Sequence, residues 1–266
     1  MTTPPPATPQ PAPPGPLPAG NAAPSGTSPL SGPVVRLALR SLLGRARVLL
    51  LLALPVLLIA LTLVQQRFAA MDGTATQNFL STFGIGVVVP VVTLICTTTL
   101  ISTEFDDGSI IQLLVKPISR VALVLSKALV ILGAVVVFGV LPLGISAMVL
   151  HPGDGLPLAI VAGSAVSGVA YVGIFTALAV ALRRSVVGAL AYWLIWESTI
   201  AGLIGPTKWL SARSWGTSVL QAASDVTAEA AQPVPTAYAV LAALVVLAGG
   251  VLLAGRRIVS MTLSDD

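Results

Sequence analysis

Charged residues are scarce in this chain. Asp, Glu, Lys and Arg make up only 9% of its 266 residues, whereas a soluble domain carries roughly 25%. Hydrophobic residues make up 55%, and the mean hydropathy is +0.95. The uncharged runs approach the roughly 20 residues that a helix needs to cross the hydrocarbon layer of a bilayer. This composition excludes an ordinary soluble domain and predicts an integral membrane protein.

Cysteine and histidine occur once each, as Cys96 and His151. A single cysteine excludes an internal disulfide, and this distant pair cannot form the ligand set of a metal enzyme. An intramembrane serine protease would need a histidine at the depth of its serine, and the stretch GSAVSG at 163–168 has no such partner. Small residues at that spacing predict close helix packing instead. We therefore expect no catalytic and no metal-binding residue, and an intramembrane enzyme is the least favoured alternative.

The chain also lacks the G-x-x-x-x-G-K-[ST] loop that cradles the phosphates of ATP. Its net charge is +4, but the basic residues stand at the ends of apolar runs and form no continuous stripe for nucleic acid. We expect membrane lipids, and not nucleic acid, to face these residues.

Residues 1–33 hold 12 of the 21 prolines and no charge, which predicts a disordered tail. The tail could also bind a proline-recognising partner. Residues 36–47, RLALRSLLGRAR, place Arg36, Arg40 and Arg47 close to one helical face. This pattern indicates either an amphipathic helix on the membrane surface or a charged flank of the first span.

Six apolar runs follow, and they predict an all-α integral membrane protein with a six-span domain over 34–258 and a short tail at 259–266. The predicted spans are 48–64, 79–102, 121–150, 156–182, 185–204 and 234–254. With the N-terminus inside, eleven Lys and Arg residues fall on inner segments and three, Arg67, Lys208 and Arg213, on outer ones. The positive-inside rule therefore places both termini in the cytoplasm and segment 205–233 outside.

The most charged passage, 103–120, lies between spans two and three. Five of its eighteen residues are charged. Asp106 and Asp107 precede a run in which Ile110, Leu113 and Leu114 repeat at helical spacing until Pro117. This predicts a short amphipathic helix in the cytoplasm. A helix of two turns is not stable alone, so its apolar face must dock on the protein's own spans or on another protein.

The stretch EFDDGSIIQLLVKPISRVALVLSK, 104–127, resembles the signature of the type-2 ABC exporter permeases. The matching positions, in register and without a gap, are Glu104, Gly108, Ser109, Leu113, Leu114, Pro117, Arg120 and Lys127. Many relatives have a basic residue and an acid where this chain has Phe105 and Ile111, which changes the expected contact pattern with a partner.

The resemblance implies a permease subunit of a bacterial plasma membrane exporter, with a second permease copy (a homodimer or a close relative) and two separate ATP-binding subunits that hold ATP and Mg. It also implies that 103–120 is the coupling helix docked on those subunits. The residues expected to make this contact are Glu104, Asp106, Asp107, Gly108, Ser109, Leu113, Leu114, Pro117 and Arg120. Segment 205–233, with Trp209 and Trp215, is implied to re-enter the membrane from outside; a plain surface loop is the alternative. The sequence does not distinguish a lipid, a hydrophobic drug, a peptide or a glycan-lipid as cargo.

Glu197 is the one acid deep within a predicted span. An ionisable group at that depth is costly, so it is a candidate for the transport path or for an interhelical bond. The alternative is a structural Glu that is either protonated or hydrogen-bonded, for example to Ser198 or Thr199. For the whole chain, the competing interpretation is a channel or a structural membrane protein without an ATPase partner.

Overall fold

The computed structural model describes residues 36, 38, 41–42, 44–68, 72–102, 120–182, 184–227 and 232–261, and over these residues the chain is helical with no strand. Six stretches are long and apolar enough to cross a membrane. They are Arg47–Phe68, Gly73–Ile101, Val121–Leu150, Leu156–Ala181, Ser185–Leu203 and Thr236–Arg257. The predicted all-α fold with six spans is therefore confirmed.

Three spans are single α-helices and three are composite. The single helices are α2 (Arg45–Phe68), α9 (Leu156–Ala181) and α13 (Thr236–Met261). Span two consists of α3 (Gly73–Phe79), η1 (Leu80–Val88), α4 (Val89–Thr97) and η2 (Thr98–Ser102). Span three consists of α7 (Arg120–Val135), η3 (Val136–Val140) and α8 (Leu141–Leu150). Span five consists of α10 (Ser185–Ala191), η4 (Tyr192–Ile200) and α11 (Ala201–Leu203). Between spans five and six lie η5 (Gly205–Leu210), α12 (Ala212–Ala223) and η6 (Asp225–Thr227).

The composite spans contain π-helical turns, and two of these turns lie on the N-terminal side of a proline. η1 ends at Val88, two residues before Pro90, and η3 ends at Val140, two residues before Pro142. A proline cannot donate a backbone hydrogen bond, and its ring collides with the carbonyl four residues earlier in an α-helix. A wider turn shifts the bonding from four to five residues, which accommodates the ring while the helix continues.

Two span ends differ from the prediction. Span two begins at Gly73 and not at 79, because the Asp72 side chain accepts a hydrogen bond from the Ala75 backbone N–H at 2.7 Å and caps α3. Two polar residues of α3, Thr76 and Gln77, are buried, and Gln77 accepts a hydrogen bond from the Ser224 hydroxyl at 3.1 Å. At the other end of the chain, α13 continues to Met261, into the segment predicted as a tail. Residues 1–33 and 262–266 lie outside the described residues.

Only part of the predicted interface helix 36–47 is described. Arg36 is exposed, whereas Ala38 and Leu42 are buried, as an amphipathic segment requires. Gly44 separates these helical residues from α2.

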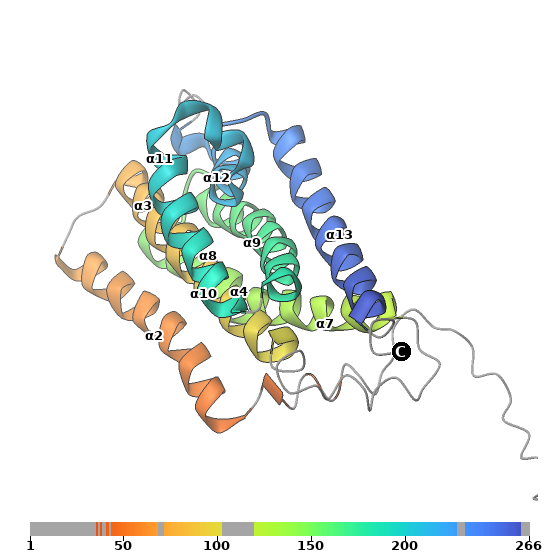
Figure 1. Cartoon of the computed structure of the whole chain (residues 1–266). Coiled ribbons are helices and arrows are strands. Elements are labelled where there is room, and N and C mark those ends of the chain that lie inside the picture. Colours follow the sequence, from red (N-terminus) through yellow and green to blue (C-terminus); the bar gives the residue numbers. More distant parts are fainter. Residues whose placement is uncertain are drawn as a thin grey trace, which may run out of the picture.

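α9 is the central helix of the bundle, with α13 on one side and α2 on the far side (Figure 1). Glycines let its neighbours approach closely. A Cβ built on Gly163 would lie 2.6 Å from the carbonyl oxygen of Gly216 in α12, and one built on Gly250 of α13 would lie 2.2 Å from that of Gly173. The small residues at 163–168 therefore serve close packing, as predicted.

α2 and span five are the least covered spans. In α2, Leu50, Val56 and Leu63 are each more than half exposed, and in span five Leu194 and Ile195 are as well. Figure 1 shows α2 at the edge of the bundle, where one side of it packs against α8. These faces are left for lipid or for another protein within the membrane.

The neighbouring glycines 249 and 250 provide a matched test of this packing. We expect Gly250→Ala to lower the stability of the bundle by about 1–3 kcal/mol, because the new methyl group forces α13 away from α9. Gly249→Ala should leave stability unchanged or slightly raised, since none of the neighbouring helices in the described part of the chain comes within 4 Å of its Cβ position. Thermal unfolding of both variants in detergent measures the difference; equal melting temperatures would contradict the close contact.

Candidate functional site

The predicted coupling residues fall almost wholly outside the described residues. This applies to Glu104, Asp106, Asp107, Gly108, Ser109, Leu113, Leu114 and Pro117. Arg120 is described only as the first residue of α7. The structure therefore describes only the helices on either side of 103–119, which are η2 (Thr98–Ser102) and α7 (Arg120–Val135).

Lys127 joins these two flanks. Its side chain is only 6% exposed, and its Nζ donates a hydrogen bond to the carbonyl oxygen of Leu100 in η2 at 3.1 Å. The last carbonyls of a helix lack partners within the helix, so a lysine from the next span can satisfy one of them. Lys127 is the last residue of the signature stretch, and the contact ties the end of span two to the start of span three.

Glu197 is buried in η4 with 2% of its surface exposed, and four donors converge on its carboxylate. Oε1 accepts hydrogen bonds from the Tyr192 hydroxyl and the Ala212 backbone N–H, both at 2.8 Å. Oε2 accepts from the Ser211 hydroxyl at 2.7 Å and from the Arg213 backbone N–H at 3.4 Å. Each carboxylate oxygen can accept two hydrogen bonds, so these four donors use the accepting capacity of both oxygens.

The predicted partners of Glu197 are wrong. The hydroxyls of Ser198 and Thr199 instead donate to the carbonyl oxygens of Trp193 and Leu194, each at 3.1 Å and five residues earlier. The π-helical turn of η4 brings those carbonyls within reach and points the two hydroxyls along their own helix. A π turn has no clear sequence signal here, because η4 contains no proline.

The carboxylate caps the start of α12 from another helix. Ser211 is the N-cap of α12, and its Oγ accepts the Ser214 backbone N–H at 3.1 Å while its hydroxyl proton goes to Glu197. The first N–H groups of a helix have no partner within the helix, and a negative charge near them is favourable. Glu197 and Ser211 together satisfy three such groups, those of Ala212, Arg213 and Ser214.

The start of α12 and the neighbouring part of span five both contact span two. The Trp193 indole Nε1 donates to the carbonyl oxygen of Gly86 at 2.9 Å, and a Cβ built on Gly86 would lie 3.1 Å from Cζ of Arg213. The Arg213 side chain therefore packs directly on the Gly86 backbone, and a methyl group at 86 would have to displace the guanidinium by a few tenths of an ångström. Spans two and five and α12 meet at this point.

Segment 205–233 is anchored along its described length. The Trp209 carbonyl accepts hydrogen bonds from the Trp215 indole at 3.0 Å and from the hydroxyl of Tyr238 in α13 at 2.9 Å. The Ser218 hydroxyl accepts the Val234 backbone N–H at 3.1 Å. Trp215 is almost fully buried and α12 packs against α9. This arrangement differs from a plain surface loop.

All four hydrogen bonds described for Glu197 come from span five and from the start of α12, so Glu197 positions α12.

We expect Glu197→Ala to lower the stability of the bundle by about 2 kcal/mol or more, because buried donors of α12 and Tyr192 lose their acceptor. Thermal unfolding in detergent measures the effect. The control is Ser198→Ala, the next residue, whose one described hydrogen bond stays within η4; an equal loss in both variants would contradict the capping role.

The sequence profile of the ABC-2 family transporter proteins matches residues 43–205, more than half of the chain. Searches of curated proteins and of solved structures give no match. The matched region begins before span one and ends after span five, and it includes the charged passage and both of its flanks. The chain belongs to the ABC-2 family of membrane transporter proteins.

Proposed function

We propose that this chain is the permease subunit of an ATP-driven exporter, and that segment 103–120 docks on a separate ATP-binding subunit. The family supports a transporter role. The observation that carries the proposal is the signature at 104–127, which stands in register between spans two and three and ends at the residue that joins those spans, Lys127. ATP and Mg would be held by two partner subunits, and this chain would catalyse no reaction.

Motion of the coupling segment would pass through contacts that the described residues make. Spans two and three would move together because Lys127 ties them at their ends. Span two would pass the motion to span five and to α12, because Trp193 and Arg213 both pack at Gly86. Closure of the ATP-binding subunits would then tilt spans two and five and open a path by alternating exposure or lateral release.

A second copy of the chain, or a close relative, would complete the pathway. The exposed apolar faces of α2 and span five leave room for such a partner within the membrane. Both termini would face the cytoplasm of a bacterial cell, and segment 205–233 would re-enter the membrane from outside. The contact of Gly216 in α12 with Gly163, two turns into α9, supports the re-entrant arrangement.

Replacing both Leu113 and Leu114 by Glu should abolish co-purification with the ATP-binding subunit, because charge cannot enter an apolar docking cleft. Insertion of the chain into the membrane should be unaffected, since the two residues lie outside the spans. The control is Gln112→Glu, which adds a charge beside the apolar pair and should retain association. Undiminished co-purification of the double variant would refute the docking role of this segment.

The orientation can be tested with single cysteines, because the natural Cys96 is buried. In intact cells we expect a membrane-impermeant maleimide to label Gly153→Cys, at an exposed position between spans three and four. Asp106→Cys should be labelled only after the membrane is permeabilised. Labelling of Asp106→Cys in intact cells would reverse the topology and remove the coupling mechanism.

A further inference from the structure

Arg213 is the second residue of α12, and its side chain lies on span two. A Cβ built on Gly86 would lie 3.1 Å from Cζ and 3.2 Å from Nε of Arg213. Gly86 stands thirteen residues after Gly73, where span two begins, and fifteen before Ile101, where it ends. The guanidinium therefore lies near the middle of the span and not at its end.

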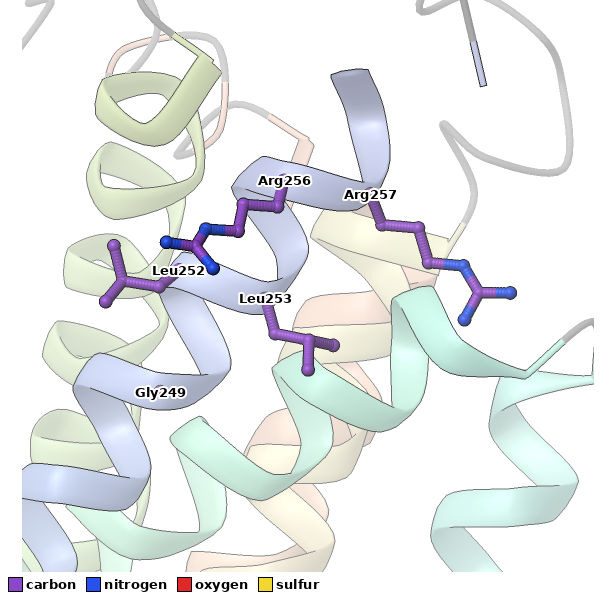
Figure 2. Close-up of a pocket in the computed structure, with 5 residues that line it drawn as sticks. All are labelled: Gly249, Leu252, Leu253, Arg256 and Arg257. Atoms are coloured by element: carbon purple, nitrogen blue, oxygen red, sulfur yellow. The ribbon is translucent and has the colours of Figure 1, made fainter. Parts of the chain in front are cut away.

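A second span gives the same depth. Tyr171 of α9 lies within electrostatic range of the Arg213 side chain, and it stands fifteen residues after the start of α9 and ten before its end. An arginine at such a depth is costly, and arginines found there face a polar path or pair with another group. Arg256 and Arg257 differ, because they are exposed at the C-terminal end of α13 and line an open groove there (Figure 2).

The Arg213 guanidinium has no acceptor among the described residues. It is half-buried, and it takes part in no hydrogen bond or ion pair within that part of the chain, where only the Arg213 backbone N–H donates, to Glu197. Glu197 cannot supply the missing acceptor, since its two oxygens already accept from four donors. A guanidinium has five N–H donors and a permanent positive charge. Its complement is an anion with several acceptors, a phosphate or a carboxylate.

The side of span two that leads to the guanidinium has a polar edge and an aromatic edge. Asn78 and Thr82 precede Gly86 at steps of four residues, and both are exposed. Residues four apart face nearly the same way in α and π turns. Phe79 and Phe83, the next residues along, stack with their ring centroids 6.0 Å apart. Polar groups on a membrane span are unfavourable towards lipid, so this side of span two suits a molecule that has both polar and apolar parts.

We propose that Arg213 binds the anionic group of an amphiphilic ligand, a phosphate or carboxylate attached to an apolar chain. The guanidinium would hold the anion through two parallel charge-assisted hydrogen bonds. The apolar chain would lie against Phe79 and Phe83, and Asn78 and Thr82 would bind polar groups next to the anion. Binding would require neither ATP nor a partner subunit. Only the identification of this ligand as cargo rests on the proposed transport function.

The test is binding of dodecyl phosphate to the purified full-length chain in neutral maltoside micelles, followed by the rise in melting temperature that a ligand of the folded state produces. The wild-type chain should be stabilised by dodecyl phosphate but not by dodecanol, which has the same chain without the charge. Arg213→Gln should raise the half-saturating concentration of dodecyl phosphate by about tenfold or more, because the charge and the paired donors are both lost. Lys208→Gln is the matched control and should bind like the wild type, since it removes one positive charge from η5 in the same connection.

A second variant keeps the charge in case Arg213→Gln does not fold. Arg213→Lys loses the planar pair of donors but stays positive, so its half-saturating concentration should lie between those of the wild type and Arg213→Gln. Dodecanoate should bind with the same dependence on Arg213, whereas inorganic phosphate, which has no apolar chain, should bind at least about tenfold more weakly.

Four outcomes would overturn the proposal. These are no stabilisation of the wild-type chain by dodecyl phosphate, an equal effect of dodecanol, an equal loss in Lys208→Gln, and wild-type binding by Arg213→Lys or Arg213→Gln. A failed coupling test with the Leu113 and Leu114 variant would leave this result unchanged, because the binding measurement contains no ATP-binding subunit.

Discussion

The hydrogen bonds between Glu197 and the start of α12 determine how the rest of the bundle can be arranged. A helix that begins in the interior exposes N–H groups that no water can reach, and each unsatisfied group costs free energy. The Glu197 carboxylate and the Ser211 hydroxyl provide the acceptors. With its first turn satisfied by Glu197 of span five, α12 can lie against spans two, four and six, and this part of the connection to span six is buried.

The position of α12 also depends on close backbone contacts. Lipid tails are as apolar as leucine, so helices within a membrane associate through packing and polar contacts more than through the hydrophobic effect. Gly163 and Gly216 allow α9 and α12 to touch, and Gly173 and Gly250 allow the same for α9 and α13. α9 is thus in close backbone contact with both α12 and α13. α2 has no such glycine contact in the described residues, and much of its surface is exposed.

Much of the fold could be predicted from the sequence, because long uncharged runs have few structural solutions in a bilayer. All six spans were found, and the small-residue stretch at 163–168 was correctly assigned to packing. The start of span two was missed, because Thr76 and Gln77 are polar and their burial depends on tertiary partners such as Ser224. The sequence signal for this helix start is Asp72, a favoured N-cap residue, but it is informative only if a helix is already assumed to begin at Gly73.

The candidate site was harder to predict. Sequence identified Glu197 as unusual, but three of its four partners lie fourteen to sixteen residues away across a turn whose path no local pattern encodes. Sequence likewise located Lys127 through its register with the signature and could not identify its acceptor, Leu100. For 103–119, the prediction of a cytoplasmic docking helix rests on the sequence signature alone.

The π-helical turns divide the spans into two mechanical kinds. α2, α9 and α13 are continuous α-helices, whereas spans two, three and five each contain at least one wide turn. Sharp bends in helices occur at prolines and at π-bulges. Spans two, three and five are therefore the helices in which a bend can be accommodated without ending the span, and spans two and three border the passage at 103–119.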